Sequence, residues 1–374
     1  MKEIINYWLY HWIDRYIGIP LCFLFYPLSK LLQKKSINYR NILAIKLSMM
    51  GDTILLVPSL RALREKFNNA YISIICSKVN IEILRDCPYI DETVVVEFTK
   101  LINPVYLLKI INKLRKNKFD LVIDFEQWFR ISTLISFFSF AKERIGFKTK
   151  GQYKHLLFTK TIPHVKNRHE VECFLDLLRP LDIETSNKNL ELWPKESNIR
   201  EVNMILESMK INSDFIVLHT EVSVRARLRQ WPIENFAELG NKFIRKYNFE
   251  ILIASTQRNK YHTERLNYLL EKKAHLLIDV PLLTLYVLLS KAKLVIANNT
   301  GFMHLAASAG AKVVCLHGPV SPVKWGPWGK GHVSIKSNLP CSPCVYLGFE
   351  YGCRINKCMR EIKPEEVFYL IDTF

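Results

Sequence analysis

The sequence lacks a Gly-x-Gly-x-x-Gly turn after any predicted strand, which argues against a dinucleotide-dependent dehydrogenase. It also lacks low-complexity tracts, and 49% of its 374 residues are hydrophobic, as expected of a folded protein. Acidic residues are scarce beside basic ones: 35 Asp and Glu against 53 Lys and Arg give a formal charge of +18. This charge favours an anionic partner, which could be nucleic acid, an anionic membrane or a phosphorylated substrate. Because the basic residues are spread along the chain without a nucleic-acid-binding signature, we predict no nucleic-acid partner.

The N-terminus has no apolar run long enough for a transmembrane helix. The uncharged run 16–29 has 14 residues and contains Pro20 and Pro27. No small-residue cleavage site follows it, so we expect no secretory signal. Residues 1–36 are instead rich in aromatic side chains and end in lysines: Tyr7, Trp8, Tyr10, Trp12, Tyr16, Phe23, Phe25, Tyr26, Lys30, Lys34 and Lys35. This composition predicts that 1–38 is a helical extension in the membrane interface, on the cytoplasmic leaflet. The alternative is a helical extension packed on the N-terminal domain.

Disulfide bonds are not predicted, although the chain has nine cysteines, because nothing in the sequence indicates an oxidising compartment. Four of them lie within eighteen residues: Cys341, Cys344, Cys353 and Cys358. Such a group could hold one structural zinc ion in tetrahedral geometry. Its spacing, with two, eight and four intervening residues, is shorter in the middle than in common zinc ribbons. Free thiols are the alternative.

Short apolar runs alternate with helix-periodic segments, and the chain is long enough for two domains. The predicted strands are 41–47, 71–76, 93–97, 119–124, 215–219, 249–254, 275–278, 293–297 and 312–317. Helical patterns lie near 54–67, 79–86, 104–116, 127–139, 196–209, 232–247, 257–272, 282–290 and 300–309. This alternation predicts an α/β fold with parallel, doubly wound sheets. We place the domains at 39–188 and 189–374, with a polar linker around 185–195.

The first candidate site follows the predicted strand 41–47. The turn that ends this strand contains Gly51, which we expect in a backbone conformation closed to other residues, and then Asp52 and Thr53. Asp52 is either an N-cap of the following helix or a general base. A helix N-terminus should lower the pKa of this carboxyl and weaken the base, unless the site desolvates it.

A second candidate site follows the strand 293–297. Asn299, Thr300 and Gly301 form a turn before a helix of small residues, and His304 lies one turn further on. The free N–H groups of the first helical turn, the Thr300 hydroxyl and His304 together suit a phosphate. Alternate arginines, Arg225, Arg227 and Arg229, follow the strand 215–219 and either clamp a diphosphate or form an exposed charged loop.

With both stretches in view, the chain resembles the heptosyltransferase-like glycosyltransferases of family 9. The matching segments are Lys46-Leu-Ser-Met-Met-Gly-Asp52, Pro58-Ser-Leu-Arg-Ala-Leu-Arg64, Arg229-Gln-Trp-Pro232, Asn299-Thr-Gly-Phe-Met-His304 and Gly318-Pro-Val-Ser-Pro-Val-Lys-Trp-Gly-Pro327. Their order and spacing agree over roughly residues 41–374. The resemblance implies a GT-B fold, in which two Rossmann-like domains face each other across a cleft. It also implies an inverting, metal-independent transfer of heptose or a related sugar from a nucleotide sugar, with no cofactor required.

By this resemblance Asp52 is the base, and the N-terminal domain binds a lipopolysaccharide-core or similar cell-surface glycan acceptor, lipid-linked or oligosaccharide. The donor diphosphate would lie at the 299–304 turn with Arg229, and the enzyme would be cytoplasmic and peripheral on the inner face of the cytoplasmic membrane. Asn299 stands where many relatives carry Asp, and Arg229 where many carry Lys, so the nucleotide and the sugar stay open. A GT-B-fold epimerase or phosphorylase, and a non-catalytic basic membrane-associated protein, are the alternatives.

Further polar residues lie at predicted strand ends. Ser48 and Gly51 beside Asp52, and Asp124 and Glu126 after the strand 119–124, are candidates for acceptor contacts, although the last two could instead cap the next helix. Thr256 and Gln257 are candidates for contact with the base or ribose of the donor. Four basic residues after the fourth strand either contact acceptor phosphates or belong to a solvated loop: Arg144, Lys148, Lys150 and Lys154.

Overall fold

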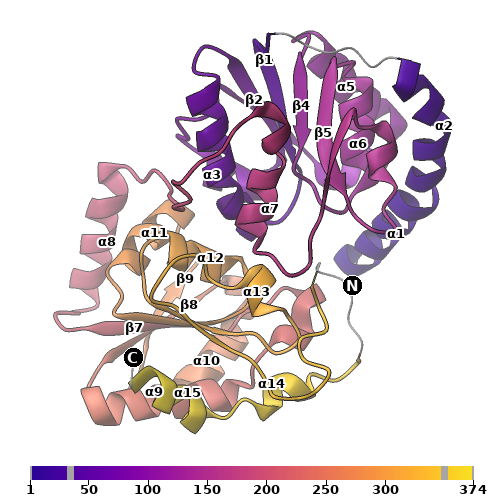
Figure 1. Ribbon diagram of the computed structural model, residues 1–374. Coiled ribbons are helices and arrows are strands. Elements are labelled where there is room, and N and C mark those ends of the chain that lie inside the picture. Colours follow the sequence, from indigo (N-terminus) through magenta and orange to yellow (C-terminus); the bar gives the residue numbers. More distant parts are fainter. Residues whose placement is uncertain (1, 32–37, 347–352, 373–374) are drawn as a thin grey trace. The chain divides into compact units, whose positions relative to one another are not determined.

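The computed structural model describes residues 2–31, 38–346 and 353–372, with the backbone alone for residues 2–8, 224 and 225. Lys34 and Lys35 of the N-terminal prediction lie outside the described residues, as does the side chain of Arg225. The chain divides into two compact units (Figure 1). Unit 1 comprises residues 1–165 and 170–188, and unit 2 comprises residues 166–169 and 189–374.

Unit 1 is built on a parallel six-stranded sheet in the order β3-β2-β1-β4-β5-β6. Its strands are β1 (Asn41–Lys46), β2 (Tyr71–Ser77), β3 (Glu92–Val96), β4 (Leu121–Asp124), β5 (Glu143–Lys148) and β6 (Lys160–Pro163). The central strands are buried on both faces, which explains their unbroken apolar runs: all side chains of β4 and those from Ile42 to Lys46 are buried. From β1 the strand order runs through β2 and β3 toward one edge of the sheet, and from β4 it runs through β5 and β6 toward the other edge. The switch point therefore lies between β1 and β4, and α/β sheets bind ligands at such a point.

Helices connect these strands. They are α3 (Met50–Lys66), α4 (Lys78–Leu84), α5 (Pro104–Arg115), α6 (Arg130–Phe138) and α7 (Glu170–Asp176), with short 3-10 turns η1 (Phe98–Ile102), η2 (Lys154–Leu157) and η3 (Arg179–Leu181). The start of α5 shows why the sequence begins a helix there. Asn103 accepts hydrogen bonds from the Val105 and Tyr106 N–H groups, and Pro104 takes the first helical position. Helices α3 and α7 pack together, as do α2 and α6 (Figure 1).

Unit 2 repeats this plan in the order β12-β11-β10-β7-β8-β9, so its switch point lies between β7 and β10. The strands are β7 (Phe215–His219), β8 (Glu250–Ser255), β9 (His275–Ile278), β10 (Leu294–Asn298), β11 (Val313–Leu316) and β12 (Val333–Ile335). The helices are α8 (Glu196–Ser208), α9 (Ile233–Tyr247), α10 (Lys260–Leu269), α11 (Leu282–Ser290), α12 (Gly301–Ser308), α13 (Pro322–Trp325), α14 (Lys357–Glu361) and α15 (Pro364–Asp372), with η4 (Val224–Arg229) and η5 (Gln257–Asn259). The α/β prediction of doubly wound parallel sheets is confirmed for both units.

Three strands escaped the sequence analysis: β5, β6 and β12. The most instructive is β5, because Arg144 and Lys154 were expected in a loop. Arg144 lies in β5 and is 1% exposed, and its guanidinium donates to the carbonyls of Ala141 and Leu157. Lys154 is fully buried, with its ammonium 3.2 Å from the Asp124 carboxylate. The loop prediction for these two residues is therefore wrong, since both charges are satisfied inside the unit.

The N-terminal extension forms two helices, α1 (Lys2–Tyr16) and α2 (Gly18–Leu31), which pack on unit 1 (Figure 1). The predicted aromatic helical extension is thus confirmed. Its inner face packs on the rest of unit 1, as the alternative interpretation predicted. None of the helices within the described ranges combines the length and the apolar character needed to cross a bilayer.

Candidate active site

Asp52 lies in the first turn of α3, directly after β1, at the switch point of unit 1. The N-cap of α3 is Met49, which has a left-handed backbone conformation (φ +69°), and no side chain caps this end of the helix. The N-cap interpretation of Asp52 is therefore wrong, and the unusual turn conformation expected at Gly51 occurs at Met49 instead. The side chain of Asp52 is left available for other contacts.

These contacts are with a buried polar cluster. The Lys46 ammonium, from the end of β1, lies 3.2 Å from Asp52 Oδ2 and 3.4 Å from Glu126 Oε2, and it donates to Gln127 Oε1 at 2.9 Å. The Gln127 amide nitrogen in turn donates to Asp52 at 3.0 Å and to Glu170 at 2.9 Å. Lys46 and Gln127 thus hold the Asp52 carboxylate from two directions.

Asp52 is the member of this cluster that reaches the surface. Its side chain is 16% exposed, whereas those of Lys46 and Glu126 are 0% and 1% exposed. Burial raises the pKa of Asp52, and the Lys46 ammonium only partly opposes this effect. For Lys46, burial alone would lower the pKa, but the carboxylates of Glu126 and Asp52 outweigh it, so the pKa is raised. The pKa of Asp52 is therefore raised by burial, not lowered as the position at a helix N-terminus alone would lead one to expect.

The other predicted acceptor residues of unit 1 are engaged within the protein. Glu126 accepts hydrogen bonds from the backbone N–H groups of Leu47 and Ser48, at 3.1 and 3.2 Å, and so fixes the turn before α3. Asp124 is fully buried between Lys154 and the Ser132 hydroxyl, which donates to it at 2.7 Å. Gly51 is buried and Ser48 is half-buried beside Asp52. Their role in acceptor binding stays a prediction.

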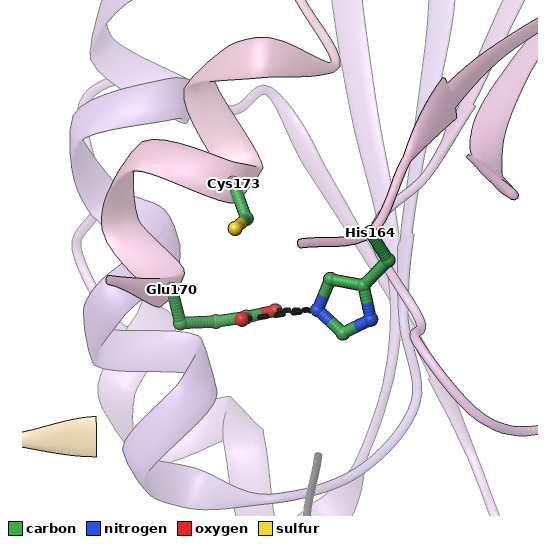
Figure 2. A group of neighbouring side chains, drawn as sticks. All are labelled: His164, Glu170 and Cys173. Carbon is green, nitrogen blue, oxygen red and sulfur yellow. Dashed lines mark hydrogen bonds and ion pairs between the residues drawn. The ribbon is translucent and has the colours of Figure 1, made fainter. Parts of the chain in front are cut away.

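One group of described residues has the composition of a metal site: His164, Glu170 and Cys173 (Figure 2). Their potential ligand atoms lie within 4.8 Å of one another, and all three residues are buried. His164 Nε2 is 3.1 Å from both oxygens of Glu170, and Figure 2 shows the two side chains directed toward each other. Glu170 also accepts a hydrogen bond from Gln127. Its carboxylate therefore links His164 to the Asp52 cluster through hydrogen bonds.

In unit 2 the switch point carries Asn298 and Asn299 at the end of β10. Asn298 accepts from the Trp231 N–H at 3.0 Å and donates to the Thr220 carbonyl at 2.9 Å, which ties together the segments that follow β7 and β10. Asn299 donates to the Trp325 carbonyl at 2.7 Å, and its amide oxygen lies 3.5 Å from the Arg229 guanidinium. Arg229, the last residue of η4, is thereby brought to the start of α12.

Several buried polar atoms near this point have no hydrogen-bond partner among the described residues: Thr300 Oγ1, His304 Nδ1 and His317 Nε2. Burial, with positive neighbours that include His169 and Arg229, lowers the pKa of His304 to about 3, and burial beside Arg229 does the same for His317. Both imidazoles are therefore neutral at physiological pH. Unpaired buried polar atoms are rare in proteins, and their grouping beside an arginine and a helix N-terminus is typical of a site for an anionic ligand.

Thr256 and Gln257 lie apart from this group, after β8. The Thr256 N–H and hydroxyl both donate to the Glu221 carboxylate, at 2.6 and 3.2 Å, and Glu221 follows the neighbouring strand β7. The Gln257 N–H lies 3.3 Å from the Asp279 carboxylate. Both residues are exposed at the carboxyl edge of the sheet, and their contact with a nucleoside stays a prediction.

The four clustered cysteines share one cavity of about 350 Å³. Cys341 and Cys353 are exposed, Cys344 is half-buried and Cys358 is buried, and burial raises the pKa of the Cys358 thiol to about 11. The lining also includes Pro319, Leu339 and Ile355. The sequence prediction that these cysteines lie together is consistent with this cavity, and zinc binding stays a prediction.

Sequence reasoning missed Lys46, Gln127 and Glu170 as partners of Asp52, and it did not assign His317 to the second site. Lys46 and Gln127 are 81 residues apart, and Gln127 and Glu170 are 43 apart, so local pattern gave no sign of their contact. One signal was present: a lysine that ends an otherwise apolar strand must find a buried partner. His317 likewise follows β11, the strand next to β10.

Two Rossmann-like parallel sheets, each with a polar cluster at its switch point, are the architecture of the GT-B class of α/β proteins. The chain belongs to glycosyltransferase family 9 (heptosyltransferase), whose family model matches residues 107–355, more than half of its length. It is therefore a glycosyltransferase.

Individual relatives agree with this assignment. The chain is 25% identical over 327 residues to lipooligosaccharide heptosyltransferase 2 of Campylobacter jejuni, covering 85% of this chain and 93% of that protein. Among solved structures, a family 9 glycosyltransferase from Veillonella parvula has a TM-score of 0.77 at 20% identity, covering 91% of this chain and 98% of the other. The ADP-heptose lipopolysaccharide heptosyltransferase II of Escherichia coli has a TM-score of 0.67 at 18% identity, covering 89% and 98%. These structures support the GT-B fold.

Proposed function

We propose that this protein is an inverting, metal-independent glycosyltransferase. It moves a heptose or a related sugar from a nucleotide sugar to a lipopolysaccharide-core or similar cell-surface glycan, at the inner face of the cytoplasmic membrane. The family supplies the reaction class. The observation that carries the mechanism is the Asp52 carboxylate, partly exposed at the switch point while its supporting partners are buried.

In this mechanism Asp52 accepts the proton of an acceptor hydroxyl while the hydroxyl oxygen bonds to the anomeric carbon of the donor sugar. The bond between that carbon and the diphosphate oxygen breaks on the opposite face, so the configuration inverts. The raised pKa of Asp52 favours proton transfer, and Lys46 and Gln127 keep the carboxylate oriented.

The donor diphosphate binds in unit 2, at the start of α12. Its negative charge is complemented by Arg229, by the backbone N–H groups at the helix start and by the Thr300 hydroxyl. The neutral ring of His304 supplies one more hydrogen-bonding group without adding charge. As the leaving group gains charge, these preorganised donors stabilise it, which is the contribution that a metal ion makes in other transferases.

The test compares the wild type with Asp52→Asn. Calorimetry against ADP-, GDP-, UDP- and dTDP-sugars identifies the donor, and nucleotide release is then measured with a lipopolysaccharide-core acceptor. We expect Asp52→Asn to bind the donor like the wild type and to lose about a hundredfold to ten-thousandfold in transfer rate. Wild-type transfer should persist in EDTA.

Retention of transfer by Asp52→Asn would reject the base assignment. Loss of wild-type transfer in EDTA, with recovery on adding a divalent cation, would reject metal independence. Epimerisation of the nucleotide sugar without any acceptor would instead identify an epimerase, and sugar transfer to added inorganic phosphate would identify a phosphorylase.

A further inference from the structure

The outward face of α2 is apolar although it is exposed. Phe23, Leu24, Leu28 and Leu31 are 52%, 67%, 43% and 82% exposed, and Pro27 lies between them. Leu24, Pro27, Leu28 and Leu31 lie one, four, five and eight residues after Phe23. This spacing places all five residues on one face of the helix. An amphipathic surface helix normally turns its apolar stripe inward, so this stripe calls for a covering partner.

The outward face of α1 continues this character. Leu9, Trp12 and Tyr16 are 50%, 56% and 57% exposed at a spacing of three and four residues. The rings of Trp12 and Tyr16 lie with their centroids 5.0 Å apart. Trp and Tyr combine an apolar body with a polar tip, and they are enriched where one side of a protein meets lipid headgroups.

The opposite face of the two helices is anchored firmly in unit 1. On α1, Tyr10 packs against Phe98 and Phe129, and the buried carboxylate of Asp14 pairs with Arg130 at 3.0 Å. The α2 contacts are made by Phe25, whose ring packs on Phe137, and by Ser29, which accepts from Arg144 at 3.2 Å. The exposed stripe is therefore held in place by a folded scaffold.

The charges on this outward face are of one sign. Between residues 9 and 31 the sequence has a single acidic residue, Asp14, and it is buried in its pair with Arg130. Arg15 and Lys30 are exposed, and each lies over a neighbouring aromatic ring, Tyr16 and Tyr26 respectively. A second copy of the chain, related by a two-fold axis, would bring these cations against their own equivalents, with no exposed carboxylate between residues 9 and 31 to neutralise them. An anionic surface complements them instead.

We infer that the outward face of α1 and α2 docks on an anionic lipid bilayer. Aromatic and aliphatic side chains enter the headgroup region while Arg15 and Lys30 pair with lipid phosphates. With 14 residues, α2 is only about 21 Å long, too short to cross the membrane, so it lies in the interface. The inference deepens the proposed function, because a lipid-linked acceptor lies at such a surface.

The test is flotation of the full-length protein with phosphatidylcholine vesicles, with and without phosphatidylglycerol, in the absence of donor and acceptor. We expect binding to the anionic vesicles that weakens as salt is added. Phe23→Ala combined with Leu24→Ala should reduce the partition coefficient about tenfold or more, because both side chains lose apolar area that contacts lipid. The matched control is Tyr261→Ala with Tyr268→Ala on α10, whose side chains are 74% and 87% exposed, and it should bind vesicles like the wild type.

Absence of wild-type binding to anionic vesicles, or equal binding by the Phe23→Ala/Leu24→Ala variant, would overturn the inference. A dimer in sedimentation that the same variant dissociates, without vesicle binding, would assign the face to a second copy. Nucleotide-sugar calorimetry separates the two proposals: the variant should keep wild-type donor affinity. Failure of the proposed function would appear as absent donor binding while vesicle binding persists.

Discussion

The two units share one strand order and differ in how they satisfy the polar groups at their switch points. In unit 1, charges of both signs are buried together and each has a partner: Lys46 contacts Asp52 and Glu126, and Gln127 joins Asp52 to Glu170. In unit 2, Thr300, His304 and His317 present neutral polar atoms that have no partner among the described residues. Unit 1 therefore pairs its buried polar groups internally, whereas unit 2 leaves hydrogen-bonding capacity unused, which the proposed function assigns to the donor.

The difference shows that the sheet topology alone does not assign chemistry. Strand β4 of unit 1 ends in Asp124, whose charge is paired with Lys154, whereas β10, which has the same place in the strand order of unit 2, ends in Asn298. A buried charge needs its partners in place before a substrate arrives, because an unpaired buried charge is strongly unfavourable. A buried neutral group costs less free energy to leave unpaired, so it can remain without a hydrogen-bond partner until a ligand binds.

The largest expected effect comes from Lys46→Met. It leaves the carboxylates of Asp52 and Glu126 buried without their cation, and we expect a loss of about 3–5 kcal/mol in the free energy of unfolding at neutral pH. Burial already raises the pKa of both carboxyls, and protonated carboxyls need no cation. The loss should therefore shrink as the pH falls through these raised pKa values. Denaturant unfolding at several pH values measures it.

Lys142→Met is the matched control. Its ammonium lies 2.8 Å from Asp120 on the same unit but is 52% exposed, so its removal should cost less than about 1 kcal/mol. Equal losses in the two variants would show that the Lys46 cluster contributes no more than a surface ion pair, and the contrast between the units would fail.

An intermediate effect is expected from Asn299→Asp. The change removes the N–H that donates to the Trp325 carbonyl at 2.7 Å and places an acceptor against an acceptor. Leaving this buried carbonyl without its donor should cost about 1–3 kcal/mol of unfolding free energy. The new carboxylate would also compete with the donor diphosphate for Arg229, so calorimetry should show weaker donor binding.

Asn241→Asp provides the comparison for this change. Asn241 also donates its amide to a carbonyl, that of Leu269 at 3.2 Å, on the half-buried α9 surface of the same unit. It should leave donor affinity unchanged. If Asn299→Asp binds the donor like the wild type, Asn299 does not contribute to the donor site.

Much of the fold was accessible from sequence because buried parallel strands are unbroken apolar runs. Strand β5 was not, since Lys142-Glu143-Arg144 at its start reads as a surface segment. Each of the last two charges has a partner from far along the chain: Glu143 accepts from Tyr39, and Arg144 donates to Ser29. Charge compensation of this kind depends on tertiary contacts and leaves no local periodicity.

The candidate sites divide in the same way. Asp52 and the 299–304 turn could be located because each follows a predicted strand with a short polar turn. The partners of Asp52 could not, because Gln127 reaches it only through the β1–β4 pairing, and Glu170 through the packing of α7 on α3. Sequence pattern thus locates strand ends, while the order of the strands in the sheet decides which ends meet.

The smallest effect on stability, and the sharpest test of the contrast, is expected from Thr300→Val. The buried Thr300 hydroxyl has no partner among the described residues, so its removal should leave the free energy of unfolding unchanged or raise it by up to about 1 kcal/mol. Donor affinity should fall about tenfold or more, because a hydrogen bond to a charged phosphate is lost.

Thr53→Val in unit 1 should do the reverse. Its hydroxyl, in the first turn of α3, donates to the Met49 carbonyl at 3.2 Å, so its loss should destabilise the protein while donor affinity is kept. If Thr300→Val destabilises the ligand-free protein and leaves donor binding intact, the Thr300 hydroxyl stabilises the fold. The buried polar groups of unit 2 would then be paired internally like those of unit 1.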